Sequence, residues 1–445
     1  MHCQIFVVVL YVSPVAAWAA CPVATTGGGG NRVVGCDLAA QGANQTARVT
    51  EGAGMPAIPA LAGGNHDAAP VIHSALTAGQ AVFLPCGTYS IRSTLEIPAG
   101  AQLHGAGYCT VLRIDSTGDV GLLANAATDV DIRNLSIMDG VTRHADDVRL
   151  YHTRGVSLSG VWVRQTAHAA SISLHLMGVL DTRMDNVTLI SDGIAGYGIL
   201  LDGDAGGTNG TYLTNVSTQG YLSGLRVNWA GSTFLDGGRY TGAYGAGISV
   251  APDSAHLIYG GIHAEAVDTF RATGIHVSGN QGDGMELVGD APVTKIRLTG
   301  IESSGNGISR GDQSYMGNGL YVANASVNGL LVQGDDFHSN YGNGLLVENG
   351  KNIIVSGNTI LNNSVMESRG SNGVTIGGNV SRMTLQDNVI GTDAMQAMAA
   401  NQAWGVYSLS VNYITVVGNR LHGNGTGNFY ILPGGLVTNT HNVTD

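Results

Sequence analysis

The stretch "NYGNGLLVENGKNIIVSGNTILNN", residues 340–363, contains two short apolar runs, each set between glycine and asparagine. In such runs apolar and polar side chains alternate, which is typical of a short β-strand with one buried face. Glycine and asparagine at the ends favour tight turns, because both adopt left-handed backbone conformations at little cost. The stretch therefore predicts short strands joined by tight turns.

Segments that resemble "VSGNTI" (355–360) recur along the chain, and each has glycine, asparagine or aspartate at its third position. Those third positions are Asn134, Gly160, Asn186, Asn215, Gly237, Gly260, Gly300, Gly334, Gly357, Asp387 and Gly418. A second strand such as "GLLVEN" (344–349) precedes most of them. A propeller blade needs about 40–45 residues and a helical solenoid needs a 3.6-residue period, and neither matches this repeat.

The fold class that fits is all-β, a single right-handed parallel β-helix. Each coil buries its inward valine, isoleucine and leucine against the neighbouring coils, so that no coil is stable alone. Asn358, Asn388 and Asn419 share one register, and we expect them to stack in a hydrogen-bonded ladder.

The composition limits the classes of function. The chain has 67 glycines, 44% hydrophobic residues, 12% charged residues and a formal net charge of -12. Few cations and a negative net charge argue against a nucleic-acid partner or a polybasic membrane surface. The apolar content excludes a disordered low-complexity chain.

The N-terminus "MHCQIFVVVLYVSPVAAWAAC" predicts a signal peptide over residues 1–20, with Ala17-Trp18-Ala19 as the cleavage site. We therefore expect a secreted or periplasmic protein. A membrane span is not expected, because the apolar run is shorter than the about 20 residues that a spanning helix needs. A lipoprotein junction at Cys21 is less favoured, since Trp18 replaces the usual leucine. A Gly/Ala-rich segment over 21–64 precedes the β-helix domain, predicted over 65–445.

Four cysteines follow the predicted cleavage site, and an even number in an exported chain fits two disulfides. Sequence order favours Cys21–Cys36 and Cys86–Cys109 without proving this pairing.

The segment 65–79 predicts a helix with Asp67 as N-cap that closes the N-terminal end of the β-helix. Apolar residues at helical spacing support it, namely Val71, Ile72, Ala75 and Leu76. The order "DAA" (67–69), "FLPCGTY" (83–89) and "LEIPAGAQLHGAG" (95–107) resembles the opening of the pectate-lyase superfamily. That grouping includes rhamnogalacturonase-like and epimerase-like proteins and phage tailspikes. The specific motif covers 65–114; the remainder resembles the family only as a generic β-helix.

The resemblance implies binding to, or action on, an acidic or complex polysaccharide, and it does not decide the reaction. A polygalacturonase mechanism is not supported. "GDGMEL" (282–287) is similar to one motif of those enzymes, but the following coils have Asn318, Asn343 and Asn372 at the equivalent position. Asp335 falls in the register of the predicted asparagine ladder.

Two outward columns follow from strand alternation. The first is Arg149, Ser173, Leu200, Arg226 and Ser249, and the second is Tyr151, His175, Asp202, Asn228 and Ala251. Because adjacent coils stack about 4.8 Å apart, their polar members form one cluster on a single face. Asp146 and Asp147 lie in the turn just before it.

The cluster contains the groups that a polyuronate lyase needs. Arg149 or Arg226 can pair with the substrate carboxylate, and His175 or Tyr151 can serve as base or acid. Asn228, Trp229 and Tyr221 are expected to contact the sugar, the two aromatic residues by stacking on its ring.

Two further roles are assigned to carboxylates. Asp202 and Asp204 in "LDGDAGG" are candidate ligands for a calcium ion, although the spacing is only a fragment of a calcium loop. A hydrolase would instead pair Asp147 with Asp202, two coils or about 9.6 Å apart, at the upper limit of the about 6.5–9.5 Å typical of inversion. An epimerase on the same fold, or a non-catalytic glycan-binding β-helix whose polar face only pairs its own charges, is the competing interpretation. The C-terminal segment lacks heptads, and we expect a monomer.

Overall fold

The computed structural model describes residues 66–79, 81–118, 120–142, 145–166, 168, 171–203, 207–252, 267–307, 317–365, 370–393, 402–410, 412–432 and 437–445. All of these belong to one compact unit, Gly52–Asp445. The predicted signal peptide, the segment 21–64 and the cysteines Cys21 and Cys36 lie outside the described residues.

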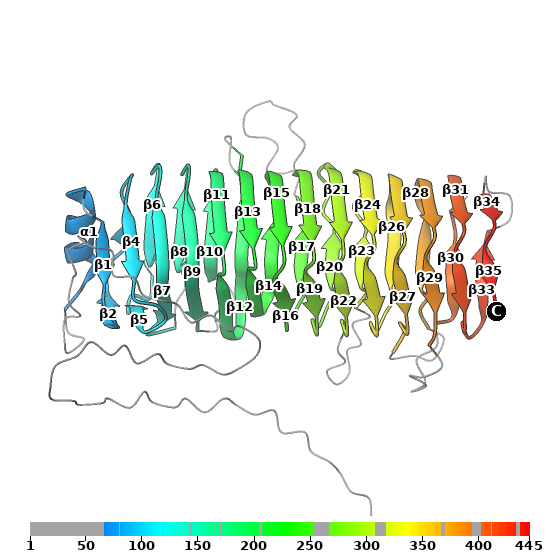
Figure 1. Ribbon diagram of the computed structural model, residues 1–445, viewed down its shortest axis with the longest axis horizontal. Helices are drawn as coiled ribbons and strands as arrows, with labels where there is room; N and C mark the ends of the chain where they lie inside the picture. Colours follow the sequence, from blue (N-terminus) through cyan, green and yellow to red (C-terminus); the bar gives the residue numbers. More distant parts are fainter. Residues whose placement is uncertain are drawn as a thin grey trace, which may run out of the picture. The chain divides into compact units, whose positions relative to one another are not determined.

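Helix α1 (Ala69–Thr77) lies at the N-terminal end of a stack of strands (Figure 1). The helix is shorter than predicted, and its N-cap is Ala68 rather than Asp67. The Asp67 carboxylate accepts hydrogen bonds from the backbone N–H of Ala69 and of Arg92, and so joins the helix to the first coil. Ile72 and Leu76 are buried against the stack, whereas Val71 is 47% exposed, so its expected place on the buried side is wrong.

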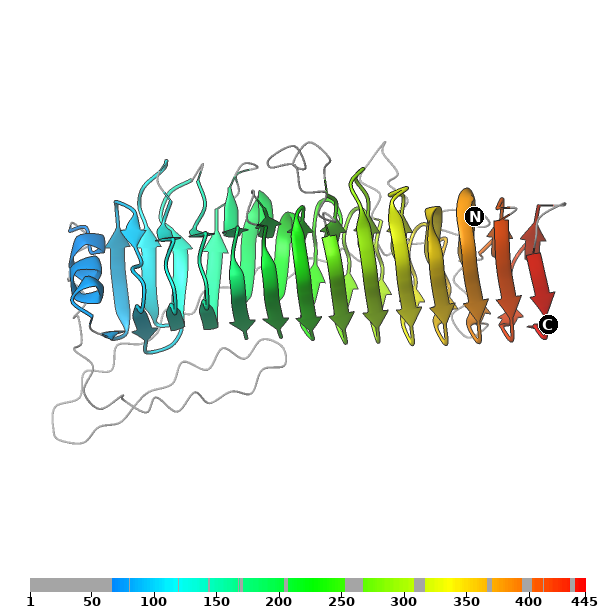
Figure 2. The same cartoon turned by 90° about the horizontal axis from the view of Figure 1, so that it is seen from above.

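The strands form parallel ladders on three faces of a solenoid of about 12 turns, which confirms the predicted all-β parallel β-helix. Each coil passes through face 1, then face 2, then face 3, and the coils follow one another in sequence order (Figure 2). Face 1 contains β1 (Val82–Leu84), β4 (Gln102–Gly105), β11 (Leu180–Asp185), β13 (Asn209–Thr214), β15 (Ala230–Asp236), β18 (Val267–Thr273), β21 (Val293–Thr299), β24 (Val327–Gln333), β31 (Asn412–Val417) and β34 (Val437–Thr440).

Face 2 contains β2 (Gly87–Ile91), β5 (Thr110–Ile114), β16 (Arg239–Thr241), β19 (His276–Ser278), β22 (Glu302–Ser304), β25 (Asp336–His338), β27 (Thr359–Leu361), β29 (Val389–Gly391), β32 (Arg420–His422) and β35 (Val443–Thr444). Face 3 contains β3 (Leu95–Glu96), β6 (Leu122–Asn125), β8 (Val148–Tyr151), β10 (Ile172–Met177), β17 (Ile248–Val250), β20 (Met285–Leu287), β23 (Leu320–Val322), β30 (Trp404–Ser408) and β33 (Gly427–Ile431).

Six longer strands continue from one face to the next. β7 (Asp131–Asp139) and β9 (Ser157–Gln165) run from face 1 to face 2, and β12 (Thr188–Asp202) and β14 (Ser217–Val227) run from face 2 to face 3. β26 (Leu345–Ser356) and β28 (Val374–Gln386) run from face 3 to face 1 of the next coil.

The corner between faces 1 and 2 is uniform. From β11 onward each such turn has two residues, and the first of them has positive φ, as in Asn186 (53°), Gly300 (64°) and Asp387 (54°). Only glycine and the short polar residues adopt this left-handed conformation at low cost, which explains the repeated third position. One position was misassigned: Gly260 lies outside the described residues, and Gly274 (φ 60°) occupies the corner between Gly237 and Gly300. The other two corners vary in length.

The second residue of this corner points inward, and in the later coils it forms the predicted asparagine ladder. The Nδ2 of Asn358 donates to Oδ1 of Asn388 (2.9 Å), and Asn388 donates to Asn419 (2.8 Å). Asp335 lies in the same register, because its backbone N–H donates to Asn358 Oδ1 (2.8 Å). These bonds satisfy buried polar groups that would otherwise cost free energy.

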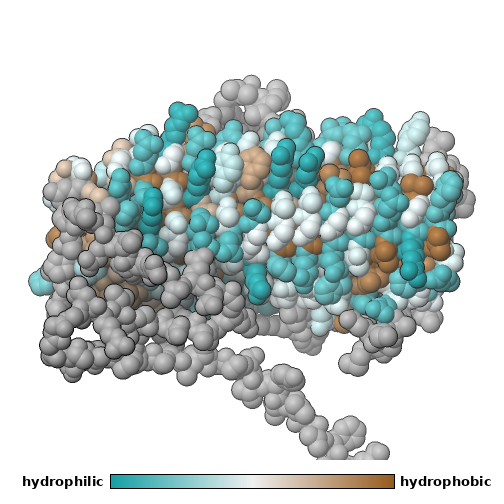
Figure 3. Space-filling model, viewed as in Figure 1, coloured by the Kyte–Doolittle hydropathy of each residue, from teal (hydrophilic) through white to brown (hydrophobic). Residues whose placement is uncertain are grey.

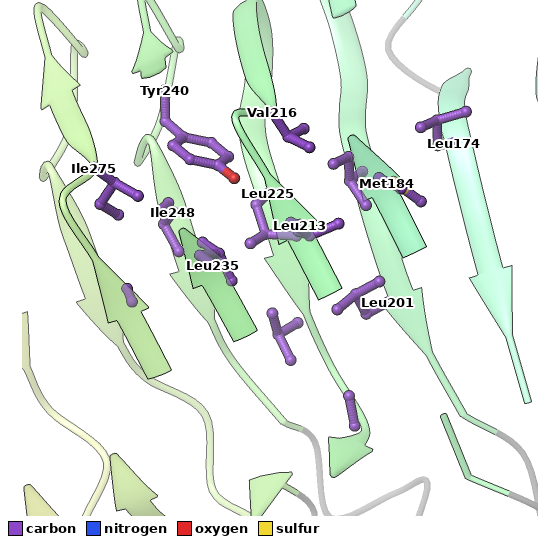
Figure 4. Packing of buried hydrophobic residues seen from close by; sticks show 14 of the residues in the cluster. Leu174, Met184, Leu201, Leu213, Val216, Leu225, Leu235, Tyr240, Ile248 and Ile275 are labelled. Carbon is purple, nitrogen blue, oxygen red and sulfur yellow. The ribbon is translucent and has the colours of Figure 1, made fainter. Parts of the chain in front are cut away.

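The interior contains leucine, isoleucine and valine from all three faces, and most of these side chains are fully buried. Figure 4 shows side chains of successive coils, among them Leu201, Leu225 and Ile248, pointing into the space that the strands enclose. Each such side chain stabilises the stack by about 1.5–3 kcal/mol. The predicted disulfide Cys86–Cys109 is present and joins the first coils.

No helix among the described residues is both long enough and apolar enough to cross a membrane.

Candidate functional site

The predicted cluster lies on face 3, but its register differs from the expected one. His175 pairs with Arg149 on one side and with Leu200 on the other, and Leu200 pairs with Arg226. The placement of Ser173 beside Arg149 and of His175 beside Tyr151 is therefore wrong. The expected and observed registers differ by two residues, and such a shift keeps His175 on the outward side, so alternation could not choose between them. The correction places the imidazole between the two arginine-bearing coils.

The centre of the cluster is the pair Asp146 and His175. Asp146 Oδ2 lies 2.8 Å from His175 Nδ1 and accepts a hydrogen bond from Arg149 Nε (2.7 Å). Because a carboxylate can only accept, the proton of this bond is on Nδ1. Both residues are buried, with 3% and 7% of their surface exposed.

The other imidazole nitrogen points toward a second carboxylate. His175 Nε2 lies 4.0 Å from Asp202 Oδ2, and it has no hydrogen-bond partner in the described part of the chain. This nitrogen is buried, so a ligand reaches it only after a local rearrangement of the side chains above it. An imidazole held by one carboxylate and facing another has the arrangement of a proton-transfer group.

Arg226 lies two coils from His175 and is held by neutral groups. Its guanidinium donates to Asn228 Oδ1 (2.7 Å), to Ser249 Oγ (3.0 Å) and to the backbone oxygen of Ala251 (3.3 Å). Among the described residues it forms no ion pair with a carboxylate. Three of its five N–H donors are used, which leaves two for a ligand.

The aromatic residues expected to contact sugar are not on the surface. Tyr221 is fully buried, its hydroxyl lies 2.8 Å from Ser173 Oγ, and burial raises its pKa well above the usual value. Its predicted role in sugar stacking is therefore wrong. Trp229 is 9% exposed and packs against Gly203, which leaves little ring surface for a ligand. Tyr151 is half-buried and stacks on His152 with ring centroids 4.0 Å apart.

Asp147 is not a surface carboxylate either. It is 1% exposed, and its Oδ2 accepts a hydrogen bond from the buried Ser173 hydroxyl (3.4 Å). The expectation that Asp147 faces Asp202 across the site is wrong, and the preceding residue, Asp146, contacts the cluster instead.

The outward columns of face 3 contain further polar groups, and Glu286 among them was missed from the sequence. Glu286 follows Ser249 in the same column and accepts a hydrogen bond from its hydroxyl, and the Tyr321 hydroxyl donates to Glu348 Oε2 (2.9 Å). Asp283 precedes β20, the strand that contains Glu286. Burial raises the pKa of Asp283 to about 7, and Glu286 adds a smaller effect in the same direction. The alternation that gave Ser249, continued through "GMEL", was the signal for Glu286.

The predicted metal ligands are Asp202 and Asp204. Within the described ranges, no group of three or more histidine, cysteine, aspartate or glutamate side chains is arranged to hold a metal ion. Asp202 is described and Asp204 lies outside the described residues, so calcium binding by this pair stays a prediction.

No protein-family model matches this sequence, and no curated protein matches it. Solved structures are similar in fold. The A-modules of the mannuronan C-5 epimerases AlgE6 and AlgE4 of Azotobacter vinelandii superpose with TM-scores of 0.54 and 0.53. They are 16% and 17% identical, over 87% of this chain and 97% and 98% of theirs.

Tailspike protein 3 of bacteriophage CBA120 superposes with a TM-score of 0.52 at 13% identity, over 84% of this chain and 58% of that one. At these identities the likeness is one of fold. The chain has the right-handed parallel β-helix fold of the pectin-lyase-like proteins, as its opening motif predicted.

Proposed function

We propose that this protein acts on an acidic polysaccharide, and that the face 3 cluster removes the proton alpha to a uronate carboxylate. The reaction we favour is β-elimination, which makes the protein a polyuronate lyase. The observation that carries the proposal is the Asp146–His175 hydrogen bond, with Arg149 on the adjacent coil and Arg226 two coils away on the other side.

Arg226 would bind the uronate carboxylate with its two remaining N–H donors in a bidentate pair. Neutralising that carboxylate stabilises the carbanion that forms when the alpha proton leaves. Ser249 and Asn228 hold the guanidinium in place, so that little side-chain entropy is lost when the ligand binds.

His175 would be the base. With its Nδ1 proton held by Asp146, the lone pair of Nε2 is the acceptor that remains on the ring. The half-buried Tyr151, two residues from Arg149 on the same strand, is the candidate that protonates the leaving oxygen. Calcium at Asp202 would serve the same purpose as the arginines, neutralising the carboxylate.

An epimerase is the nearest alternative, because C-5 epimerisation begins with removal of the same proton. The names of two similar structures refer to that reaction on mannuronan, at low identity. A second candidate class follows from the buried Nε2 of His175. If the imidazole only bridges Asp146 and Asp202, face 3 is a glycan-binding surface without catalysis.

The test is incubation of the protein with alginate, polygalacturonate and bacterial exopolysaccharides in D2O, with and without calcium. Ultraviolet absorbance of unsaturated products reports elimination, deuterium at C-5 reports epimerisation, and reducing ends without absorbance report hydrolysis. His175→Ala and Arg226→Ala are expected to lose the signal, whereas His276→Ala, an exposed histidine on face 2, serves as the matched control.

Elimination or C-5 exchange that persists in His175→Ala would refute the assigned base. Binding without any product across the panel would favour the non-catalytic candidate.

A further inference from the structure

A column of outward side chains on face 1 combines arginines with aromatic rings on five consecutive coils. We call this column the arginine–aromatic ladder, and the strand register places its members directly beside one another. Its members in order are Arg183, Tyr212, Phe234, Arg271 and Arg297. None of these residues belongs to the face 3 cluster, and the proposed lyase reaction does not use them.

Four of the five members of the ladder contact one another across neighbouring coils. The rings of Tyr212 and Phe234 are stacked, with centroids 5.1 Å apart and an interplanar angle of 11°. The Arg183 guanidinium lies 5.2 Å from the centre of the Tyr212 ring, and that of Arg271 lies 5.7 Å from the Phe234 ring. The stacked pair therefore holds a cation over each end, which fixes the guanidiniums along the solenoid axis.

Within the described part of the chain, the ladder gathers three arginines without carboxylate partners in one column. Arg183, Arg271 and Arg297 are exposed, and among the described residues none of them forms an ion pair with a carboxylate. Other arginines are paired with aspartate: Arg113, Arg133, Arg149, Arg154, Arg164 and Arg420. In a protein with a net charge of -12, three cations without carboxylate partners in one column are available to an anionic ligand.

The side chains around the ladder favour a ligand that is long and narrow, such as a linear chain. Two exposed carboxylates, Asp185 and Asp236, lie in the neighbouring column toward face 2. They repel an anionic ligand and so confine it to the column of the ladder. Figure 3 shows strongly hydrophilic side chains next to hydrophobic ones along the row of coils on the side seen in Figure 1. On the C-terminal side the column continues with Leu331 and Ile354, the latter 43% exposed.

We propose that the arginine–aromatic ladder is a second binding site, separate from face 3, for a uronate-containing polysaccharide chain lying along the solenoid axis. The guanidiniums would pair with carboxylates, and the outward edges of the aromatic pair would contact the pyranose rings. The coil spacing of about 4.8 Å is comparable to the length of one sugar residue in an extended chain. The site holds the polymer and needs no chemistry, so it stands whether or not face 3 is catalytic.

The experiment compares binding of the whole protein to polygalacturonate and alginate with binding of two charge-matched triple variants. One removes the ladder cations (Arg183→Ala, Arg271→Ala, Arg297→Ala), and the other removes three arginines of face 2 (Arg164→Ala, Arg239→Ala, Arg420→Ala). The ladder variant is expected to lose at least about tenfold in affinity, since three charge-assisted contacts to the polymer are removed together. The face 2 variant is expected to stay near the wild-type affinity.

Two additional measurements serve as controls. One tests whether the ladder variants are destabilised, and the other tests whether the face 3 cluster still works in them. Arg271→Gln alone, checked for its melting temperature, tests the ladder with one mild change if the triple variant is unstable. Product formation from a short oligouronate is expected to be unchanged in the ladder variants, which distinguishes this site from the face 3 cluster.

Equal polyuronate affinity in the wild type and the ladder variants would overturn the proposal. A stronger dependence on the ladder for a single-stranded oligonucleotide than for polyuronate would also overturn it, as would a ladder-dependent dimer in light scattering without polysaccharide binding.

Discussion

Asp146 is the residue on which the face 3 cluster depends, because one carboxylate oxygen accepts hydrogen bonds from both His175 and Arg149. Asparagine keeps the shape of this side chain but offers only a neutral acceptor. The imidazole and the guanidinium would lose their shared anion, and both would be free to change rotamer.

We expect Asp146→Asn to lower the activity proposed for face 3 by about 10²-fold or more and the free energy of unfolding by about 1–3 kcal/mol. Product formation and urea denaturation measure the two effects. Glu302→Gln, at a partly exposed carboxylate on face 2, is the control and is expected to change neither. Full activity in Asp146→Asn would mean that the Asp146–His175 bond has no part in the reaction.

At this scale the sequence identified the right side chains but not all of their neighbours. Arg149, Arg226 and Asp202 follow from period-two alternation, whereas Asp146 lies in a turn, where no period applies. Tyr221 is different. It shares the parity of Leu225 and Val227 on the same strand, and this parity by itself predicts an inward ring.

Among the elements, the asparagine ladder contains one member of a different type, Asp335. Its Oδ1 accepts the backbone N–H of Ile301 (2.7 Å), while Oδ2 is buried without a hydrogen-bond partner in the described residues. Burial raises its pKa to about 7. The folded state therefore keeps this proton to about pH 7, whereas an unfolded aspartate releases it near pH 4.

Because the folded state binds the extra proton, the contribution of Asp335 to stability is full below about pH 4 and is lost as the pH rises to about 7. Asp335→Asn would place an amide where Asn358 and Asn388 have theirs, and those amides donate to the carbonyls of Val332 and Val355. We expect the variant to be more stable at pH 8 by about 1–3 kcal/mol. Its melting temperature would also vary less between pH 4 and 7.

Melting curves of the wild type and Asp335→Asn at several pH values test this expectation, and Asp236→Asn serves as the exposed control. An Asp335→Asn variant that is less stable than the wild type at pH 8 would contradict this, because it would mean that the carboxylate stabilises the fold more than an amide at position 335.

The molecule as a whole is a stack in which each coil contacts mainly its two neighbours, so that stability is transmitted along the axis. Phe270 is fully buried in the coil of β18, between β15 and β21. We expect Phe270→Ala to lower the free energy of unfolding by about 3–5 kcal/mol through the cavity it leaves. Tyr413→Ala, at a ring that is 64% exposed, is the comparison and is expected to cost less than about 0.5 kcal/mol.

Denaturant titrations followed by circular dichroism measure both variants. A Phe270→Ala protein as stable as Tyr413→Ala would mean that the stack closes around the cavity.

The architecture could be predicted from sequence because the same two-residue corner recurs, with Asn358, Asn388 and Asn419 in one register. The position of Gly260 could not, since a long segment between β17 and β18 contains glycines that fit the pattern equally well. Face 1 was missed as a binding surface for another reason. Arg183, Tyr212 and Phe234 are far apart in the sequence, and only the strand register makes them neighbours.

The constant corner between faces 1 and 2, beside two corners of variable length, has a consequence for protein engineering. A peptide tag inserted between Thr299 and Glu302 would displace the left-handed Gly300 and the buried Ile301, and so break the register of every later coil. The same tag placed between Ser304 and Leu320, where the chain already spans a longer connection, would leave both neighbouring strands paired. Insertions are therefore expected to disrupt the corner between faces 1 and 2 and to be tolerated at the other two corners.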